Sequence, residues 1–341
     1  MSTVWIDESS AKKLEALLRD SRVLKAGESV GGLESAGDGN MNVTLRVSLQ
    51  GGDSTRTIIV KQSRPFVAKY RSIEAPLERI EFESAFYEFV ESDASLARKM
   101  PQKLAWIPAH SLLVLEDLGT GLDATRWYDQ APETLQEHSE ALLAWLCRLH
   151  ETSKDRVGSA KFANRGLRAL NHAHIFDIPF RDPPEIQLDE VQAGFEAATL
   201  EVRRNSQLRS RALQLGKRYL ADGTTLLHGD YYPASWLASE AGVYVIDPEF
   251  CFAGPAEFDF GIMLAHLRLI DPVFSESTFQ PRVAELPGNI NMELVEGFAA
   301  IEVLRRLLGV AQLPLKMGLD QRINLVERSQ RVLLAQSQIF A

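Results

Sequence analysis

The strongest constraint on the fold of this chain is a strand–turn–strand pattern close to its N-terminus. The run MNVTLRVSL at 41–49 alternates apolar and polar residues and is rich in β-branched side chains. The run RTIIVK at 56–61 returns as a second strand, and Gly51 and Gly52 between the two runs favour a tight turn. The sequence therefore predicts a β-hairpin, preceded by a glycine-containing loop.

The pattern changes from strand to helix along the chain. Helical spacing of apolar residues is found over 9–27, 77–90, 133–153 and 188–220, and twice after residue 292. Further strand signals are found at 111–118 and in the segments TTLLHGD and GVYVIDPEF. We therefore predict an α+β chain with two lobes, a small β-rich N-terminal lobe at 1–118 and a larger, mainly helical C-terminal lobe at 119–341.

Composition and charge exclude several classes of protein. Of the 341 residues, 45% are apolar and 24% are charged, which is typical of a soluble globular protein. The net charge of −9 and the lack of a basic run argue against a nucleic-acid-binding protein. No window approaches about 18 consecutive apolar residues, so no membrane-spanning segment is expected. Cys147 and Cys251 each lie in an apolar stretch, which argues against disulfides and thiolate metal sites and fits a cytoplasmic protein.

Two acidic motifs in the C-terminal half carry the strongest functional signal. His228-Gly229-Asp230 is followed by Ser235, and then by a predicted strand that ends in Asp247-Pro248-Glu249. Phosphoryl transfer needs one carboxylate that accepts the proton of the attacking hydroxyl, and further oxygen ligands that hold Mg²⁺ against the nucleotide phosphates. Asp230 suits the first role. Asp247 and Glu249 suit the second, because residues two apart in a strand face the same side.

Each of these motifs alone has an ordinary interpretation as turn and strand-end residues. Their order favours a phosphoryl-transfer site, because the expected partners lie upstream in the chain. These partners are the glycine loop Gly37, Asp38, Gly39 and Asn40, the strand-end Lys61, and Glu83 on the following helix. Glycine lets backbone amides approach phosphates, and a lysine oriented by a glutamate neutralises phosphate charge.

Three segments, HGDYYPASWL, VIDPEF and EFDFG, resemble motifs of the aminoglycoside phosphotransferase and choline kinase family, whose members are protein-kinase-like enzymes. Within that family the sequence is most similar to 5-methylthioribose kinases, which share GDGN, a VKQ lysine motif, a LEDL-like hinge and IDPEF. The resemblance covers most of the chain. It implies a bilobal protein-kinase-like fold with ATP and Mg²⁺ as cofactors.

The resemblance also assigns roles to single residues. It implies a base at Asp230, Mg²⁺ ligands at Asp247, Glu249 and Ser235, a phosphate clamp at Lys61 and Glu83, an adenine-binding hinge at Glu116, Asp117 and Leu118, a brace of the catalytic loop at Asp259, and substrate contacts at Arg305 and Arg306. Arginine suits a phosphate because its charge is permanent and its fork matches the oxygens. Adjacent arginines on a helix are otherwise most often on a solvated face.

The catalytic loop departs from the family pattern. Tyr232 stands where a second histidine is usual, Pro233-Ala234 replaces Thr-Gly, and Ser235 replaces asparagine. The chain is also short for a methylthioribose kinase. We therefore expect a substrate pocket with an altered rim, to which Tyr232 contributes.

The predicted activity is ATP-dependent phosphorylation of a hydroxyl group on a small molecule, with a methylthioribose-like sugar favoured. An aminoglycoside, a choline-like amine or another small alcohol is the alternative. A protein substrate is disfavoured because only residues 248–258 separate Asp247 from Asp259, which leaves little room for an activation segment. A catalytically weak nucleotide-binding sensor is the alternative of another class, suggested by the altered loop YYPAS. A homodimer is the default expectation for a soluble oligomer.

Overall fold

The computed structural model describes residues 3–36, 41–51, 55–119, 121–158, 160–240, 242–272, 274, 277, 279–286 and 290–335. The chain divides into two compact units. The first unit consists of Met1–Leu122 and Tyr244–Phe250, and the second of Asp123–Val243 and Cys251–Ala341. The lobe boundary predicted after residue 118 stays a prediction. The boundary between the two compact units lies after Leu122, four residues later, and residues 244–250 also belong to the first unit.

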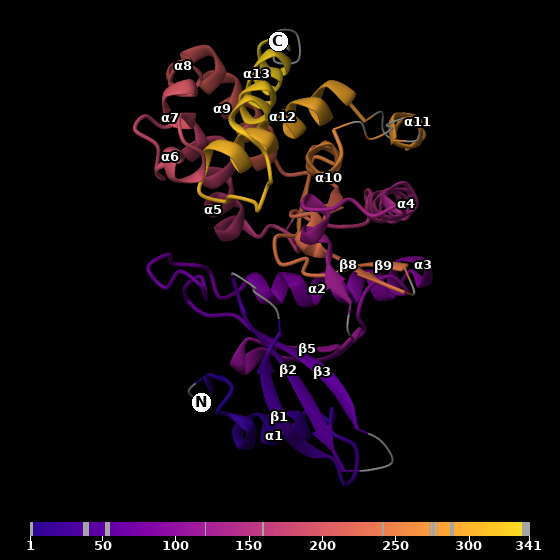
Figure 1. Cartoon of the computed structure of the whole chain (residues 1–341). Helices are drawn as coiled ribbons and strands as arrows, with labels where there is room; N and C mark the ends of the chain where they lie inside the picture. The colour runs from indigo at the N-terminus through magenta and orange to yellow at the C-terminus, as the bar shows by residue number, and fades with distance from the viewer. Residues whose placement is uncertain are drawn as a thin grey trace. The chain divides into compact units, whose positions relative to one another are not determined.

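The first unit is built on an antiparallel sheet of five strands (Figure 1). The strand order is β1 (Ser29–Ser35), β2 (Val43–Gln50), β3 (Arg56–Gln62), β5 (Leu112–Glu116) and β4 (Lys103–Ile107). Its helices are α1 (Ala11–Asp20), α2 (Arg79–Glu91) and α3 (Ala94–Ala97). The predicted hairpin is β2 and β3, and Gly51 after β2 has a φ of +88°. A side chain at Gly51 would collide with the carbonyl oxygen of Gly27.

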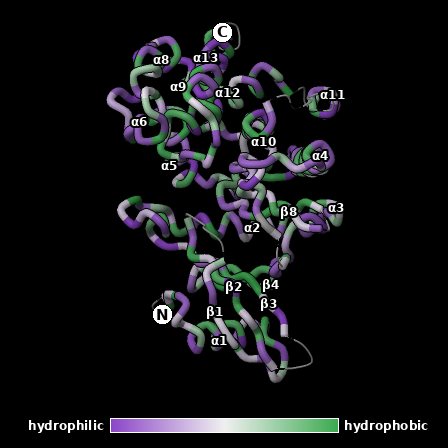
Figure 2. Tube along the Cα trace, viewed as in Figure 1, coloured by the Kyte–Doolittle hydropathy of each residue, from purple (hydrophilic) through white to green (hydrophobic). Residues whose placement is uncertain are grey.

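One face of this sheet forms the core of the unit with α1. The core residues alternate along the strands, and they include Leu45, Val47 and Leu49 of β2, Ile58 and Val60 of β3, and Leu14 and Leu18 of α1. Figure 2 shows hydrophobic and hydrophilic residues together along the strands of this sheet. Because successive side chains in a strand point to opposite faces, Lys61 lies on the face opposite to Val60. The strand pattern thereby places the buried Lys61 on the face of the sheet away from α1.

The second unit is mainly helical. Its longer helices are α4 (Leu135–Ser153), α5 (Arg165–Phe176), α9 (Ser206–Leu220), α10 (Glu257–Ile270), α12 (Met292–Leu308) and α13 (Leu319–Ala335). A two-stranded sheet pairs β7 (Thr225–Leu227) with β10 (Phe252–Gly254). The strand β8 (Trp236–Ser239) is followed by β9 (Gly242–Val245), and the chain passes from the second unit to the first within β9. Helix α12 packs against both α10 and α13 (Figure 1). Although α10 is buried and apolar, none of the helices in the described part of the chain is long and apolar enough to cross a membrane.

The structure differs from the sequence-based expectations at several elements. Strands β1 and β4 and helix α10 were not predicted, and α1 ends at Asp20 rather than near Gly27. The helix expected over 188–220 is interrupted, and consists of α6 (Leu188–Val191), α7 (Phe195–Ala198), α8 (Leu200–Arg204) and α9. Gly194 precedes α7 with a φ of +82°, and the Asn205 side chain caps α9, so both residues act as breaks.

Candidate active site

A buried lysine in the first unit lies between two carboxylates. Lys61 of β3 donates a hydrogen bond to Glu83 Oε1 of α2 at 2.6 Å, and a second one to Asp247 Oδ1. Lys61 is 6% exposed and Glu83 is fully buried. Burial alone would lower the pKa of Lys61, but Asp247, Glu83 and Glu249 raise it well above its ordinary value. The lysine is therefore held as a cation.

The carboxyl group of Glu83 responds to the same environment in the opposite direction. Burial raises the pKa of Glu83 to about 7, although the nearby Lys61 opposes this change. Its second oxygen, Oε2, is buried and has no hydrogen-bond partner. Lys61 therefore lies between two different acidic groups, the buried Glu83, whose pKa is raised, and the 41% exposed Asp247.

Asp247 and Glu249 lie in the loop that follows β9, not in a strand. Asp247 has a φ of +62°, in the left-handed region that residues other than glycine rarely adopt. The expectation that both residues face one side of a strand was wrong, because β9 ends at Val245. In the loop, the Asp247 side chain is 41% exposed and contacts Lys61, whereas Glu249 is 4% exposed.

Two residues that the sequence reasoning missed hold Glu249. Asn42 Nδ2 donates to Glu249 Oε2 at 2.9 Å, and Arg79 Nε lies 3.5 Å from the same oxygen. Asn42 immediately follows Met41 at the start of the described segment, and Arg79 begins α2. The position of Asn42 next to the glycine loop was a usable signal. Arg79 offered none, because a charged residue at the start of a helix is usually solvated.

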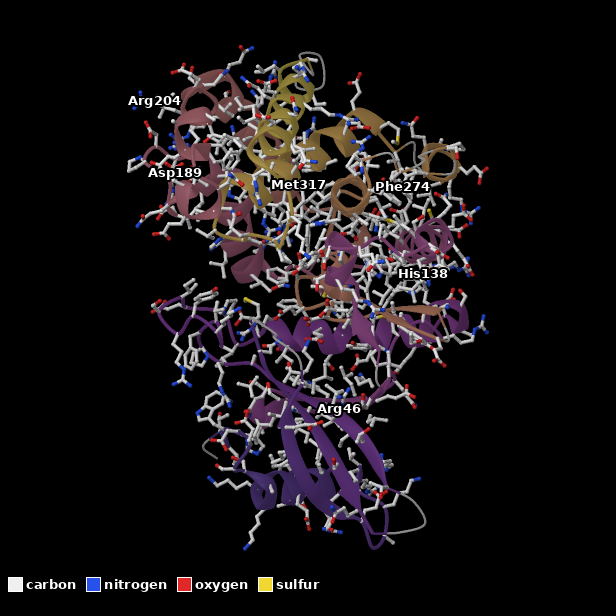
Figure 3. All side chains as sticks on the ribbon, viewed as in Figure 1. Arg46, His138, Asp189, Arg204, Phe274 and Met317 are labelled. Carbon is white, nitrogen blue, oxygen red and sulfur yellow. The ribbon has the colours of Figure 1, made fainter. Side chains whose placement is uncertain are left out.

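The acidic side chains of the predicted hinge form hydrogen bonds with neighbouring residues. Arg46 of β2, labelled on the sheet in Figure 3, makes a two-pronged contact with Asp117, with Nε to Oδ2 at 2.7 Å and Nη2 to Oδ1 at 3.1 Å. Glu116 Oε2 accepts a hydrogen bond from the Gln102 amide at 3.1 Å. The Glu116 amide donates in turn to the Gln102 carbonyl oxygen at 2.8 Å, and the role of Glu116, Asp117 and Leu118 as an adenine-binding hinge stays a prediction. The glycine loop Gly37, Asp38, Gly39 and Asn40 lies outside the described residues, and its role stays a prediction.

In the second unit, Asp230 lies on a loop whose preceding backbone amides are bound by Asp259. The fully buried Asp259 of α10 accepts hydrogen bonds from the amides of His228 at 2.7 Å and Gly229 at 3.0 Å, so its bracing contact is confirmed. Gly229 has a φ of +82°, which this tight loop requires. On the far side, Ser235 Oγ donates to the carbonyl oxygen of Asp230 at 2.8 Å. The loop is therefore held at both ends, while Asp230 itself is only half-buried.

The Ser235 contact bears on its predicted role. Ser235 is 3% exposed, and its hydroxyl proton is used to close the loop. The loop is fixed further by Tyr231, whose hydroxyl donates to the Leu142 carbonyl of α4 at 2.9 Å and whose ring stacks on Trp145. Ser235 as a metal ligand stays a prediction, and its observed contact is the hydrogen bond within the loop that carries Asp230.

Arg305 and Arg306 are buried in a charged cluster on α12. Arg305 is 8% exposed and Arg306 is 4% exposed, so the alternative of a solvated helix face is wrong. Glu302, one turn earlier and fully buried, binds both guanidinium groups, with Oε2 3.1 Å from Arg305 Nη1 and Oε1 2.6 Å from Arg306 Nε. The Arg306 guanidinium lies 4.4 Å from the ring centroid of Tyr232, which brings two of the predicted substrate residues together.

The charge state of the cluster around Glu302 follows from the pKa changes of Glu302 and His266. Burial would raise the pKa of Glu302, but Arg305 and Arg306 outweigh it and hold that pKa well below its ordinary value. Burial lowers the pKa of His266 to about 4, so this histidine is neutral near pH 7. Its Nε2–H donates to Glu302 at 3.0 Å, and Tyr128 therefore donates to its Nδ1. Two arginines and one glutamate leave a net positive charge, with Arg305 Nε and Arg306 Nη2 buried and unpartnered.

Comparison with known proteins identifies the family. A model described as "Phosphotransferase enzyme family" matches residues 47–282, which is more than half of the chain. The chain belongs to this family. The matched region of the phosphotransferase begins within β2 and ends within α11 (Phe279–Ala284), and so contains Lys61, Glu83, Asp230, Asp247 and Glu249. The predicted enzyme class, a small-molecule kinase, is confirmed.

Related proteins narrow the comparison further. A methylthioribose kinase of Exiguobacterium sibiricum is 31% identical over 320 residues, which cover 82% of this phosphotransferase and 79% of the relative. A methylthioribose kinase of Geobacillus thermodenitrificans is 27% identical over 325 residues, which cover 84% and 81% of the two chains. The resemblance predicted from the sequence motifs is therefore confirmed.

Solved structures support the fold. A choline kinase of Streptococcus pneumoniae matches with a TM-score of 0.51 at 15% identity, covering 95% of this phosphotransferase and 98% of that chain. A choline kinase of Cryptosporidium parvum Iowa II matches with a TM-score of 0.52 at 13% identity, covering 96% and 97%. The predicted protein-kinase-like fold is confirmed by these likenesses.

The donor set of the first unit fits a divalent cation. Asp247 and Glu249 supply hard carboxylate oxygens, the ligands that Mg²⁺ prefers. With Glu83 they place three carboxylates against Lys61 and Arg79, so the cluster has one negative charge in excess when all five groups are ionised. Within the residues that the structure describes, no group of three or more His, Cys, Asp or Glu side chains could hold a metal. A pair of carboxylates is nevertheless what Mg²⁺ uses when phosphates complete its ligands.

Proposed function

We propose that this phosphotransferase uses ATP to phosphorylate a hydroxyl group of a methylthioribose-like sugar, with Asp230 as the catalytic base. The observation that carries the proposal is the buried cation Lys61, paired with Glu83 and Asp247. A lysine fixed in this way neutralises phosphate charge without needing to reorganise. The substrate class is supported by the relatives, which include methylthioribose kinases that match more than four-fifths of this chain.

The proposed reaction needs little covalent chemistry from the protein. The substrate hydroxyl attacks the γ-phosphorus of ATP, a new oxygen–phosphorus bond forms, and the bond to the β,γ-bridging oxygen breaks to release ADP. Asp230 orients the hydroxyl and accepts its proton. The hydrogen bonds of Asp259 and Ser235 fix the main chain on both sides of Asp230, so the carboxylate is positioned before substrate binds.

Asp247 and Glu249 are the residues that would hold Mg²⁺ in this proposal. When bound, Mg²⁺ neutralises charge on the β- and γ-phosphates of the nucleotide. Lys61 is paired with Asp247 here, and we expect it to move its hydrogen bond from Asp247 to a phosphate oxygen when the nucleotide enters. Glu83 keeps the lysine oriented during that exchange.

The arginine cluster on α12 favours a sugar over a cationic substrate. Arg305, Arg306 and Glu302 have a net positive charge, and Arg305 Nε and Arg306 Nη2 are buried donors without partners. Such a cluster attracts hydroxyl or phosphate oxygens and repels an ammonium group, because a like charge cannot be screened in a buried site. Arg306 and the stacked Tyr232 are therefore proposed to contact the sugar, and choline-like amines are disfavoured.

An ADP-release assay with Mg-ATP tests the proposal. The panel contains methylthioribose, ribose, choline, homoserine and two aminoglycosides, with the Asp230→Asn variant as the control for background ATP hydrolysis. We expect release stimulated by methylthioribose and lost in Asp230→Asn. Stimulation by another panel member alone would refute a methylthioribose-like sugar as the substrate. Nucleotide binding without turnover of any panel member would favour the alternative of a catalytically weak nucleotide-binding sensor.

Two further expectations belong to this proposal. Cys147 and Cys251 are both buried free thiols, and burial raises the pKa of Cys147 to about 11, which keeps it unreactive and suits a reducing cytoplasm. A homodimer remains the expectation for oligomeric state. Sedimentation equilibrium of the purified chain distinguishes a dimer from a monomer.

A further inference from the structure

Glu249 is held by two side chains that have no role in the proposed reaction. Asn42 Nδ2 donates to Glu249 Oε2 at 2.9 Å, while Asn42 Oδ1 accepts a hydrogen bond from Arg79 Nε at 3.1 Å. Arg79 Nε also lies 3.5 Å from Glu249 Oε2. The asparagine therefore uses both ends of its amide, which fixes the amide orientation and leaves Glu249 Oε2 with a defined donor.

Arg79 is anchored to the main chain and cannot follow Glu249 if that residue moves. Its guanidinium donates to the carbonyl oxygens of Arg64 at 2.8 Å, Pro76 at 2.7 Å and Met41 at 2.8 Å. Arg79 is fully buried and Asn42 is 5% exposed. The anchor thus connects the start of α2, the segment after β3 and the residue that precedes Asn42 to a single carboxylate.

We propose that Asn42 and Arg79 are positioning residues that orient Glu249 for binding the divalent cation beside Asp247. This inference depends on the proposed function, because it requires Asp247 and Glu249 to be the metal ligands. A carboxylate whose outer oxygen is fixed by hydrogen bonds presents its other oxygen in one direction. Removal of such outer partners typically weakens metal affinity about 10- to 100-fold.

Two buried residues of the second unit serve as controls for a loss of Mn²⁺ affinity caused only by removing a buried polar side chain. Arg168 in the second unit is also buried, at 2% exposed, and also donates to main-chain carbonyl oxygens, those of Ala163, Tyr219 and Ala221. Its acidic partner is Asp222, which is 40% exposed and lies on the surface. Asn171, at 4% exposed, matches Asn42 in burial and donates to the hydroxyl of Tyr219. Arg168→Gln and Asn171→Ala are therefore matched controls.

The test measures Mn²⁺ binding to the ADP complex of the full chain by electron paramagnetic resonance, with ADP affinity in the absence of metal as a second readout. For Asn42→Ala and Arg79→Gln we expect the Mn²⁺ dissociation constant to rise about 10- to 100-fold. Metal-free ADP affinity should change less than about twofold, since neither side chain is proposed to touch the nucleotide. The two control variants should bind Mn²⁺ like the unmodified chain.

Two reference variants separate this inference from the proposed function. If Asp247→Asn and Glu249→Gln leave Mn²⁺ binding unchanged, the proposed metal site is wrong and the inference is overturned with it. If those variants abolish binding while Asn42→Ala binds Mn²⁺ normally, only the inference is overturned. Should Arg79→Gln fail to fold, Asn42→Ala decides, because it removes the donor to Glu249 and leaves the Arg79 contacts with the main chain in place.

Discussion

Replacing Asp259 with asparagine should loosen the loop that carries Asp230. The two carboxylate oxygens of Asp259 accept from the amides of His228 and Gly229, and Oδ2 also lies 3.2 Å from His150 Nε2. Asparagine keeps one oxygen but turns an amino group toward one of these amides. One buried N–H is then left without an acceptor, and the remaining hydrogen bond loses its charge assistance.

The magnitude follows from those two losses. An unsatisfied buried donor costs about 1–3 kcal/mol, and replacing a charged acceptor by a neutral one costs about 1 kcal/mol. We therefore expect the free energy of local opening to fall by about 2–4 kcal/mol, which is about a 30- to 1,000-fold loss of amide protection. Because Asp259 does not touch substrate, kcat should fall more than KM rises.

Hydrogen exchange followed by mass spectrometry measures this effect directly in a peptide covering residues 226–232. Asp222→Asn is the matched control, since Asp222 is 40% exposed and its pair with Arg165 lies at the surface, while its other partner, the buried Arg168, keeps its hydrogen bonds to main-chain carbonyl oxygens. This control should alter protection of the same peptide by less than about tenfold, as expected for an exposed ion pair. Unchanged protection of residues 226–232 in a folded Asp259→Asn variant would refute the bracing argument.

Two further outcomes are expected from the cluster on α12. Glu302→Gln should lower the free energy of unfolding by about 3–5 kcal/mol in urea titrations, because it leaves two buried arginines uncompensated. Glu296→Gln on the same helix, which breaks the partly exposed pair with Arg268, should cost about 0–1 kcal/mol; equal effects would contradict the buried-charge interpretation. For pH, the His266 pKa of about 4 in the folded state lies below the ordinary 6.5, so its contribution is complete above pH 6.5 and is lost as pH falls toward 4. Between pH 7 and 5 this loss is about 2 kcal/mol, and a His266→Gln variant that shows the same fall would exclude His266 as its source.

Local patterns in the sequence were sufficient to predict much of the fold. The hairpin of β2 and β3 was readable because alternation and a glycine turn are properties of neighbouring residues. Strand β1, in contrast, has the sequence SVGGLES, and it is a strand because it pairs with β2. The helix α10 was missed because it is largely apolar and buried on nearly every face, which leaves little helical periodicity to detect.

The candidate site shows the same division. Asp230, Asp247 and Lys61 could be proposed from the sequence because they occur in short motifs with known chemistry. Glu302 was missed, although it lies three and four residues before Arg305 and Arg306, because a glutamate on a helix is ordinarily solvated and only tertiary packing buries it here. The conformation of Asp247 was also not predictable, since a φ of +62° is imposed by the surrounding structure and not by local preference.

The contact between Arg46 and Asp117 has a consequence for inhibitor design. In this enzyme the Asp117 carboxylate is already bound by both prongs of Arg46, and the Arg46 Nη2 also reaches the Gly119 carbonyl oxygen at 3.0 Å. A basic group on an inhibitor would have to displace a guanidinium that is bound through two charge-assisted hydrogen bonds. If the predicted hinge is the adenine site, selectivity is therefore better sought through shape and main-chain contacts than through charge.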